Sequence, residues 1–252
     1  MSKRRLKPWV QWFLTLLGLS LLVGAISKNY DEQSCQRVVI RFFPENADGS
    51  FLTEEDILEL LSRHGGIFLR GEKYKNLNLK QLEEQVASSP YVEYCNVYRD
   101  LAGSLFVEVH MFEPIARFYN PQGEDYYWSR KGALIPFTSH YTPRVPVITR
   151  EGEELLPNPQ EREEDARLLA LMQFIHEHPF WQACISQVHV NKNQDIWLYP
   201  QIGGQAIHIG NVKDISNIFA KLKILYDTIL PIQGWYRYRK VDLRFERQII
   251  CE

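Results

Sequence analysis

His176-Glu177-His178 is the one place in the sequence where two histidines lie close enough to share a ligand. If this segment is helical, the two imidazole rings point about 200° apart, because each residue turns an α-helix by about 100°. Rings on opposite faces cannot hold one metal ion, and the spacing is not the H-E-x-x-H of zinc hydrolases. We expect both histidines to lie at the surface or to cap a helix.

Motifs that place a nucleophile or cradle a phosphate are missing from the sequence. There is no G-x-S-x-G, S-x-x-K, Walker-type loop or G-x-G-x-x-G. The four cysteines, Cys35, Cys95, Cys184 and Cys251, form no C-x-x-C, and they leave open either buried free thiols or one structural disulfide. We therefore predict no catalytic residue, cofactor, metal or small-molecule substrate. The enzyme alternative is an anchored periplasmic hydrolase.

The C-terminal segment alternates between apolar and polar residues. The apolar positions are Val241, Leu243, Phe245 and Ile249, and the polar ones are Asp242, Arg244, Glu246 and Gln248. This alternation predicts a strand over 241–250 whose apolar face, Phe245 included, points inward. Two interpretations remain open: an ordinary last strand, or a sheet edge whose unpaired N–H and C=O groups bind a strand of a partner.

Charge and composition limit the partners. The chain has 29 Lys and Arg against 31 Asp and Glu, a net charge of −2, and it lacks a stripe of basic and aromatic residues, so nucleic acid is not expected. The first 27 residues nevertheless hold Lys3, Arg4, Arg5 and Lys7 and no acid. The remainder is clearly acidic, which indicates two parts in different surroundings.

The segment from Trp9 to Ile26 has no charged residue. As a helix it would be roughly 27 Å long, close to the hydrocarbon thickness of a bilayer. The sequence therefore predicts a cytoplasmic tail over 1–8 and a transmembrane helix over 9–27, with the bulk of the chain exported. A cleaved secretory signal is the alternative, because 25–27 resembles a cleavage site.

Residues 36–113 read as a β-α-α-β-β module. A strand over 37–43 precedes a helix that begins at Thr53, with Asp56 at the third helical position, and a second helix begins at Asn78. An alternating hairpin follows over 91–112. Two helices of such a module cover one face of a three-stranded sheet.

Residues 114–252 read as a mostly antiparallel β domain with two helices. The expected strands cover 115–119, 126–128, 145–149, 187–190, 196–199, 205–209 and 241–250. The expected helices cover 161–176 and 212–230, the second ended by Pro231. The predicted fold class is α+β.

Several motifs resemble the FtsQ/DivIB family of bacterial division proteins. They are Pro90-x-Val92-x-x-Cys95-x-Val97-x-Arg99, Pro114-Ile-Ala-Arg117, Tyr127-x-x-x-x-Gly132-x-x-x-Pro136, Val145-Pro-Val-Ile-Thr149 and Val241-Asp-Leu-Arg-Phe245. The resemblance implies a POTRA domain followed by a β domain, in a single-pass inner-membrane protein at the division septum. It also implies a non-enzymatic scaffold of septal peptidoglycan synthesis that links early and late division proteins.

The resemblance further implies binding of FtsB/DivIC-like and FtsL-like proteins through the last strand. Carried over by position, the partner-binding residues are Arg244, Phe245, Glu246, Arg247, Gln248, Ile249 and Ile250. The alternative function is a POTRA-type, chaperone-like module in outer-membrane protein assembly or secretion. That function would call for several POTRA copies or a large barrel, which this sequence does not predict.

Overall fold

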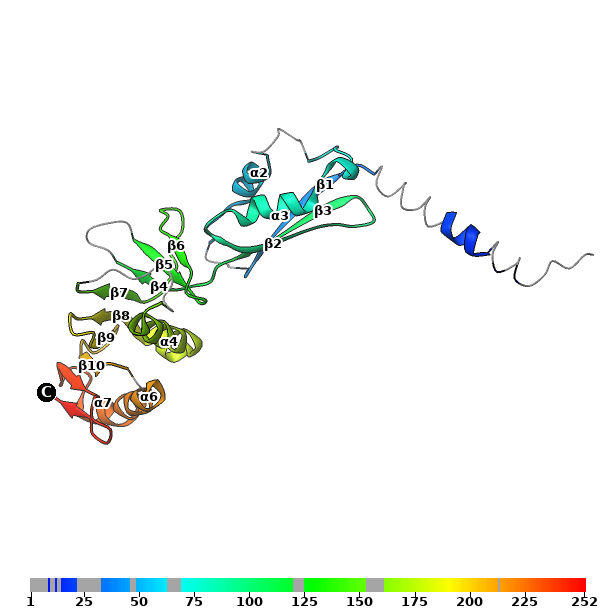
Figure 1. Cartoon of the computed structure of the whole chain (residues 1–252). Helices are drawn as coiled ribbons and strands as arrows, with labels where there is room; N and C mark the ends of the chain where they lie inside the picture. The colour runs from blue at the N-terminus through cyan, green and yellow to red at the C-terminus, as the bar shows by residue number, and fades with distance from the viewer. Residues whose placement is uncertain are drawn as a thin grey trace, which may run out of the picture. The chain divides into compact units, whose positions relative to one another are not determined.

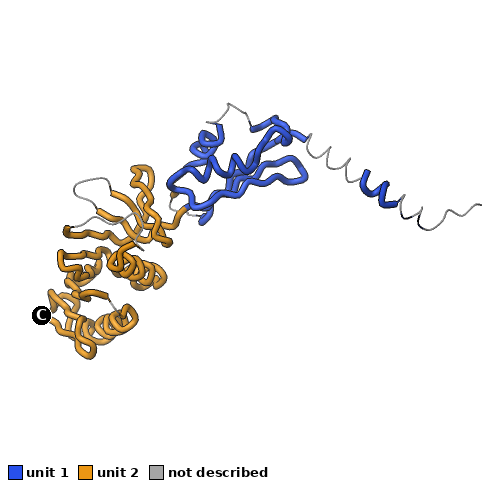
Figure 2. The backbone as a smooth tube through the Cα atoms, in the orientation of Figure 1, with its two compact units in different colours: residues 1–48, 52–111 blue, residues 49–51, 112–252 orange. Residues whose placement is uncertain are grey.

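The computed structural model describes two units, each of which is treated by itself (Figure 2). The described residues are 9, 12, 15–21, 33–45, 49–62, 69–119, 125–152, 161–212 and 214–252. Unit 1 comprises Met1–Asp48 and Leu52–Met111, and unit 2 comprises Gly49–Phe51 and Phe112–Glu252.

The first unit has the β-α-α-β-β order that the sequence predicts. Its elements are β1 (Arg37–Phe43), α2 (Glu54–Ser62), a 3-10 turn (Tyr74–Asn76), α3 (Leu79–Ala87), β2 (Val92–Arg99) and β3 (Ser104–Met111). The sheet order is β1-β3-β2, with β1 parallel and β2 antiparallel to β3. Alternate side chains of β3, such as Val107 and Val109, are fully buried against the helices.

Both helices of this unit begin where their capping residues predict. At the start of α2, Thr53 N–H donates to Asp56 Oδ2 at 2.7 Å, and Asp56 N–H donates to Thr53 Oγ1 at 3.2 Å. This reciprocal pair is a capping box. At α3, Asn78 Oδ1 accepts from Gln81 N–H at 3.3 Å.

The second unit is built on one sheet. Its strands are β4 (Pro114–Phe118), β5 (Tyr126–Ser129), β6 (Leu134–Pro136), β7 (Val147–Arg150), β8 (Ile185–Val190), β9 (Ile196–Pro200), β10 (Ala206–Gly210), β11 (Lys240–Asp242) and β12 (Ile250–Cys251). Among the described residues the nine strands follow the order β12-β11-β10-β9-β8-β7-β4-β5-β6. The pairs β4–β7, β7–β8 and β10–β11 are parallel.

The sheet is therefore mixed, and the predicted α+β class, with a mostly antiparallel β domain and two helices, is corrected to a mixed α/β architecture with more helices. Helical connections precede β8 and β11 and carry the chain back to the end of the sheet from which it came, so these strands lie parallel to β7 and β10. Strand β7 lies parallel to β4 after the β5–β6 hairpin. The helices are α4 (Glu163–Glu177), α5 (Pro179–Cys184), α6 (Ile215–Ile224), a π-helical turn (Leu225–Ile229) and α7 (Leu230–Gln233). Figure 1 shows α4 and α6 on the same side of the strands β7 to β10.

Pro231 does not end the last helical stretch, contrary to the sequence prediction. The helix widens to a π-helical turn, in which Leu230 N–H donates to Leu225 O. Pro231, which has no N–H, then falls in the first turn of α7, where a missing donor costs nothing. The stretch ends instead at Gly234, whose φ of 99° suits a glycine at a helix C-terminus.

The predicted transmembrane helix over 9–27 is also corrected. In the described part of the chain, no helix combines the length and the apolar character that crossing a bilayer requires. The helical residues described continuously there are 15–21, and residues 10–11, 13–14 and 22–27 lie outside the description, as does the expected tail over 1–8.

Candidate functional site

The chain ends in a hairpin rather than in the single strand expected over 241–250. Strand β11 pairs with β12 in antiparallel register, Val241 opposite Cys251 and Asp242 opposite Ile250. The segment 243–249 connects them, with a turn at 245–247. The predicted inward position of Phe245 is wrong, because 48% of this residue is exposed.

A buried lysine on α6 holds the start of this turn. The Lys221 ammonium donates to the backbone oxygen of Leu243, and it donates to that of Phe245 at 2.8 Å. Lys221 is 7% exposed, and burial lowers its pKa below the usual value. Two carbonyl groups, two positions apart on the turning chain, thus accept hydrogen bonds from one side chain of α6.

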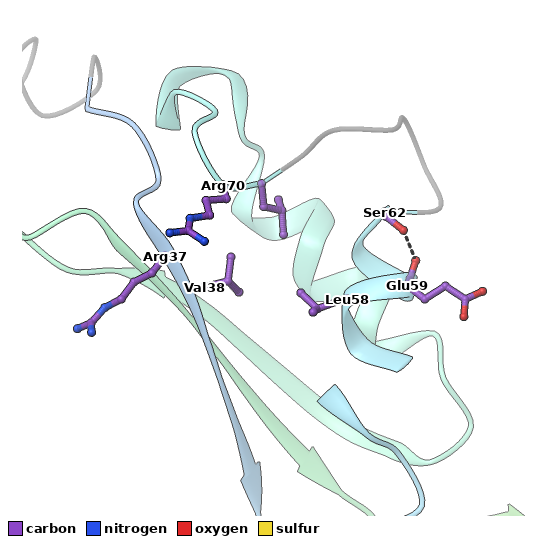
Figure 3. Close-up of a pocket in the computed structure, with 7 residues that line it drawn as sticks. Arg37, Val38, Leu58, Glu59, Ser62 and Arg70 are labelled. Carbon is purple, nitrogen blue, oxygen red and sulfur yellow. Dashed lines mark hydrogen bonds between the residues drawn. The ribbon is translucent and has the colours of Figure 1, made fainter. Parts of the chain in front are cut away.

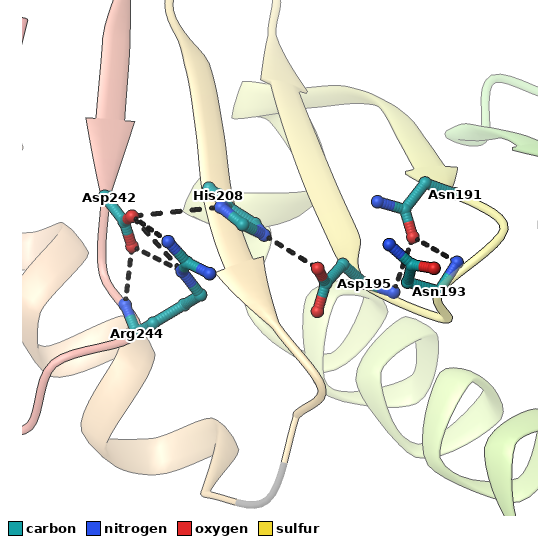
Figure 4. Close-up of polar contacts among 6 residues, drawn as sticks. All are labelled: Asn191, Asn193, Asp195, His208, Asp242 and Arg244. Carbon is teal, nitrogen blue, oxygen red and sulfur yellow. Dashed lines mark hydrogen bonds and ion pairs between the residues drawn. The ribbon is translucent and has the colours of Figure 1, made fainter.

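A chain of polar side chains also holds the segment before the turn and runs from Arg244 through Asp242 and His208 to Asp195 (Figure 4). Arg244 Nη2 donates to Asp242 Oδ2 at 2.7 Å, and His208 Nδ1 on β10 lies 3.8 Å from the same oxygen. His208 Nε2 lies 3.5 Å from Asp195 Oδ2, and the ring stacks on Trp197 with centroids 4.1 Å apart.

Protonation in this cluster is governed by burial and by the arginine. The hydrogen bonds from Arg244 hold the pKa of Asp242 below its usual range. Burial, followed by the charge of Arg244, lowers the pKa of His208 below 6.5. The arrangement contains no nucleophile, and its carboxylate nearest the hairpin is already paired with a guanidinium, so it suits positioning better than catalysis.

The close approach of Arg244 to β10 requires a glycine. Gly210 has a φ of 65°, and a Cβ at this position would lie 2.9 Å from Arg244 Cγ. Glycine is therefore required for two reasons: it adopts the left-handed backbone without strain, and it leaves space for the aliphatic part of the Arg244 side chain.

The outer edge of β12 presents unpaired backbone groups. Lys240 and Glu252 exchange N–H···O bonds of 3.2 and 2.9 Å, which makes them a hydrogen-bonded pair. Because such pairs alternate along an antiparallel ladder, Val241 and Cys251 form a non-hydrogen-bonded pair. The N–H and C=O of Cys251 therefore point away from β11, and β12 is the terminal strand of the sheet among the described residues.

Two other sheet edges are blunted. In unit 1, the Glu83 carboxylate on α3 accepts the outward N–H of Val97 on β2 at 2.8 Å. At the far end of the sheet in unit 2, β6 consists of three residues and ends in Pro136, which has no N–H. The outward N–H of Cys251 on β12, by contrast, faces no neighbouring strand in the described part of the chain.

The edge strand β1 lies beside a pocket of about 680 Å³ (Figure 3). Val38 and Leu58 form apolar parts of its lining, Arg37 and Arg70 contribute basic groups, and Ser62 Oγ donates to Glu59 O at 2.9 Å. The pocket carries no set of side chains with catalytic geometry.

The structure places the seven predicted partner-binding residues around the hairpin turn. Before the turn, Arg244 is paired with Asp242, and Phe245 is exposed. Glu246 and Arg247 form the turn, and Gln248 N–H lies 3.5 Å from Phe245 O. After the turn, Ile249 packs against the core and Ile250 begins β12. Sequence reasoning missed Lys221, His208 and Asp195, which reach the hairpin from other elements and carry no local signal. It also missed the outward backbone of Cys251.

The histidine pair and the cysteines behave as ordinary structural residues. His176 Nε2 lies 3.0 Å from Glu113 Oε1, and His178 Nδ1 lies 2.8 Å from Phe174 O, where it caps α4. All four cysteines are free thiols. The described residues contain no group of three or more side chains placed to bind a metal.

Comparison with protein families assigns both units. Residues 113–252 match the model described as FtsQ/DivIB, C-terminal related, and residues 33–110 match that of a POTRA-like domain. No curated protein matches the sequence closely enough to count as a relative. The first match covers more than half of the chain, in the region that carries the terminal hairpin. The chain therefore belongs to the FtsQ/DivIB family of non-enzymatic division scaffolds and is a divisome-type protein with a POTRA-like domain.

Proposed function

We propose that this protein is a scaffold of the division septum that binds FtsB/DivIC-like and FtsL-like proteins by adding a strand of the partner to β12. Through these partners it would link early and late division proteins in septal peptidoglycan synthesis. The proposed binding residues are Arg244, Phe245, Glu246, Arg247, Gln248, Ile249 and Ile250, together with the backbone of Cys251.

The outward N–H and C=O of Cys251 are the observation that carries this proposal. An added strand satisfies such groups through the ladder hydrogen bonds that hold a sheet together. Phe245 and Ile250 are both exposed beside this edge and offer apolar area to the side chains of the added strand. The partner would gain affinity from the backbone and specificity from these side chains.

The test replaces Cys251 by proline in the full chain. Proline removes the N–H that points toward the partner and leaves the N–H of Glu252, which pairs with Lys240, in place. Cys251→Ala is the matched control, because it changes the side chain and keeps the backbone donor. Binding is measured by calorimetry with the purified FtsB/DivIC-like protein of the same organism.

We expect Cys251→Pro to weaken binding at least tenfold while Cys251→Ala binds as the wild type does. The two variants should unfold at the same temperature within about 2 °C, since both remove the Cys251 side chain, which packs against the core of unit 2. Equal affinities of the proline and alanine variants would refute strand addition at β12.

A further inference from the structure

Residues 232–239, from the last residues of α7 to the start of β11, form an exposed segment rich in aromatic residues. Ile232 is 76% exposed and Tyr236 is 78% exposed, and Trp235 is exposed between them. Large apolar side chains gathered in this way on a surface mark an interaction site more often than isolated ones do. These side chains are distinct from the hairpin residues 244–251 that form the proposed binding edge.

The segment has a rigid base. Trp235 packs edge-on against Tyr226, with ring centroids 5.8 Å apart, and the backbone oxygen of Trp235 accepts a hydrogen bond from the Gln205 side chain. Tyr226 is buried in the core of unit 2. The exposed side chains are therefore carried on an anchored backbone, so binding would not require this backbone to be ordered.

The charge of the segment is positive. Arg237 and Arg239 are both exposed, and within the described ranges neither forms an ion pair. The Arg237 guanidinium lies 6.0 Å from the centre of the Tyr238 ring, which leaves its donors free for an anionic group. Tryptophan, tyrosine and arginine are the residues most enriched at the energetic centres of protein interfaces.

The segment is continuous with the edge of β12. Arg239 N–H donates to Glu252 O at 2.7 Å, so the basic aromatic segment begins where β12 ends. A strand paired along β12 would pass this end of the segment near Glu252. Residues of the partner that flank the strand on that side would then be available to the side chains of 232–239.

We propose that Ile232, Trp235, Tyr236, Arg237 and Arg239 form a platform for an acidic, amphipathic segment of the same protein whose strand pairs with β12. This inference rests on the proposed function and adds the chemistry of the partner. Acidic side chains of the segment pair with the two arginines, and its apolar side chains cover Ile232 and Tyr236. The strand alone would supply part of the affinity, and the platform would supply selectivity for a partner with this flanking charge.

Two variants of the full chain test the platform against the purified FtsB/DivIC-like protein. The double variant Arg237→Glu/Arg239→Glu reverses the charge and leaves the backbone donor of residue 239 in place. The double variant Ile232→Ala/Tyr236→Ala removes apolar area. The controls are Lys192→Glu, an exposed basic residue in the turn between β8 and β9, and Leu101→Ala, which is 85% exposed in unit 1.

We expect the charge reversal to weaken binding about thirtyfold at low salt and much less at high salt, because exposed charges are screened. The apolar variant should weaken binding about tenfold at every salt concentration, in line with the loss of interface anchors. Both controls should bind as the wild type does.

The outcomes separate this inference from the proposed function. If Cys251→Pro weakens binding and both platform variants bind as the wild type, strand addition stands and the platform is refuted. If Cys251→Pro has no effect while the platform variants weaken binding, strand addition is refuted and the platform remains a partner surface. If the platform variants instead lose binding only to vesicles of phosphatidylcholine and phosphatidylglycerol, the platform meets a lipid surface, and the inference is overturned.

Discussion

Replacing Lys221 by methionine should loosen the terminal hairpin and leave the rest of the sheet folded. The ammonium of Lys221 is the shared donor for two carbonyl oxygens, those of Leu243 and Phe245, at the point where the chain leaves β11. Methionine has a similar length and no donor, so the change removes both hydrogen bonds and little volume.

The size of the effect follows from the surroundings of the two oxygens. Leu243 is almost fully buried, so its carbonyl loses its side-chain donor in a place with little access to water, at a cost of about 1–3 kcal/mol. Phe245 is half exposed, and water can replace the donor to its carbonyl. Burial of the ammonium, which lowers the pKa of Lys221, is relieved by methionine and offsets part of the loss. We expect a net decrease in the free energy of unfolding of about 2 kcal/mol.

Urea denaturation of the full chain measures this decrease, and amide hydrogen exchange locates it. Lys223→Met is the matched control: this lysine lies two positions after Lys221 on α6, is largely exposed and pairs with Asp227 at 3.0 Å. An exposed pair of this kind contributes at most about 0.5 kcal/mol. Exchange should accelerate at residues 248–252 in the Lys221 variant alone. Equal stability of the two variants would show that Lys221 does not hold the turn.

Three further changes test other parts of the structure. Asp165→Ala leaves the buried guanidinium of Arg150 without its carboxylate and should lower the free energy of unfolding by about 3 kcal/mol or more in urea; a loss below 1 kcal/mol would contradict the buried pair. The pKa of His208 lies below 6.5 in the folded chain, so the unfolded chain binds a proton at this histidine more readily. The free energy of unfolding should therefore be greatest above about pH 7 and should decrease as the pH falls through 6.5. In thermal melts between pH 7 and pH 5, His208→Asn should show a smaller decrease than the wild type, and parallel curves would argue against the assignment. Asn78→Ala removes the acceptor for Gln81 N–H and should cost about 1 kcal/mol by thermal melting, whereas no change would show that the cap is not formed in solution.

Local signals in the sequence were sufficient for the POTRA-like unit. Thr53 with Asp56, and Asn78 with Gln81, are contacts between residues three positions apart, so the residue types alone locate the helix starts. The hairpin over β2 and β3 follows from alternation around a turn that contains Gly103. The order of the strands in the nine-stranded sheet was not accessible in this way, because parallel pairing depends on where each helical connection returns the chain.

The terminal hairpin shows how an alternating pattern conceals a turn. Val241 and Leu243 before the turn, and Ile249 and Cys251 after it, face the core in the same odd-numbered phase that one continuous strand would have. The turn itself, at 245–247, contains no glycine, proline or asparagine, so no turn signal interrupts the pattern. The chain turns there because Lys221, more than twenty positions earlier, binds the carbonyl groups of Leu243 and Phe245.

The proposed function of the hairpin depends on how the edge of β12 differs from the edges of β2 and β6. An unpaired edge invites uncontrolled association, and proteins usually blunt it. Here Glu83 occupies the outward N–H of Val97 on β2, and Pro136 ends β6. Strand β12 differs from these strands because it has only two residues. It pairs with β11, and the segment between the two strands is held by Lys221 and Arg244. The exposed edge is therefore short and has a defined register. A two-residue edge offers too few hydrogen bonds to capture an arbitrary strand, and a partner must therefore gain further contacts next to it. The exposed residues at the turn and on the platform lie at the two ends of β12, where such contacts would select the partner.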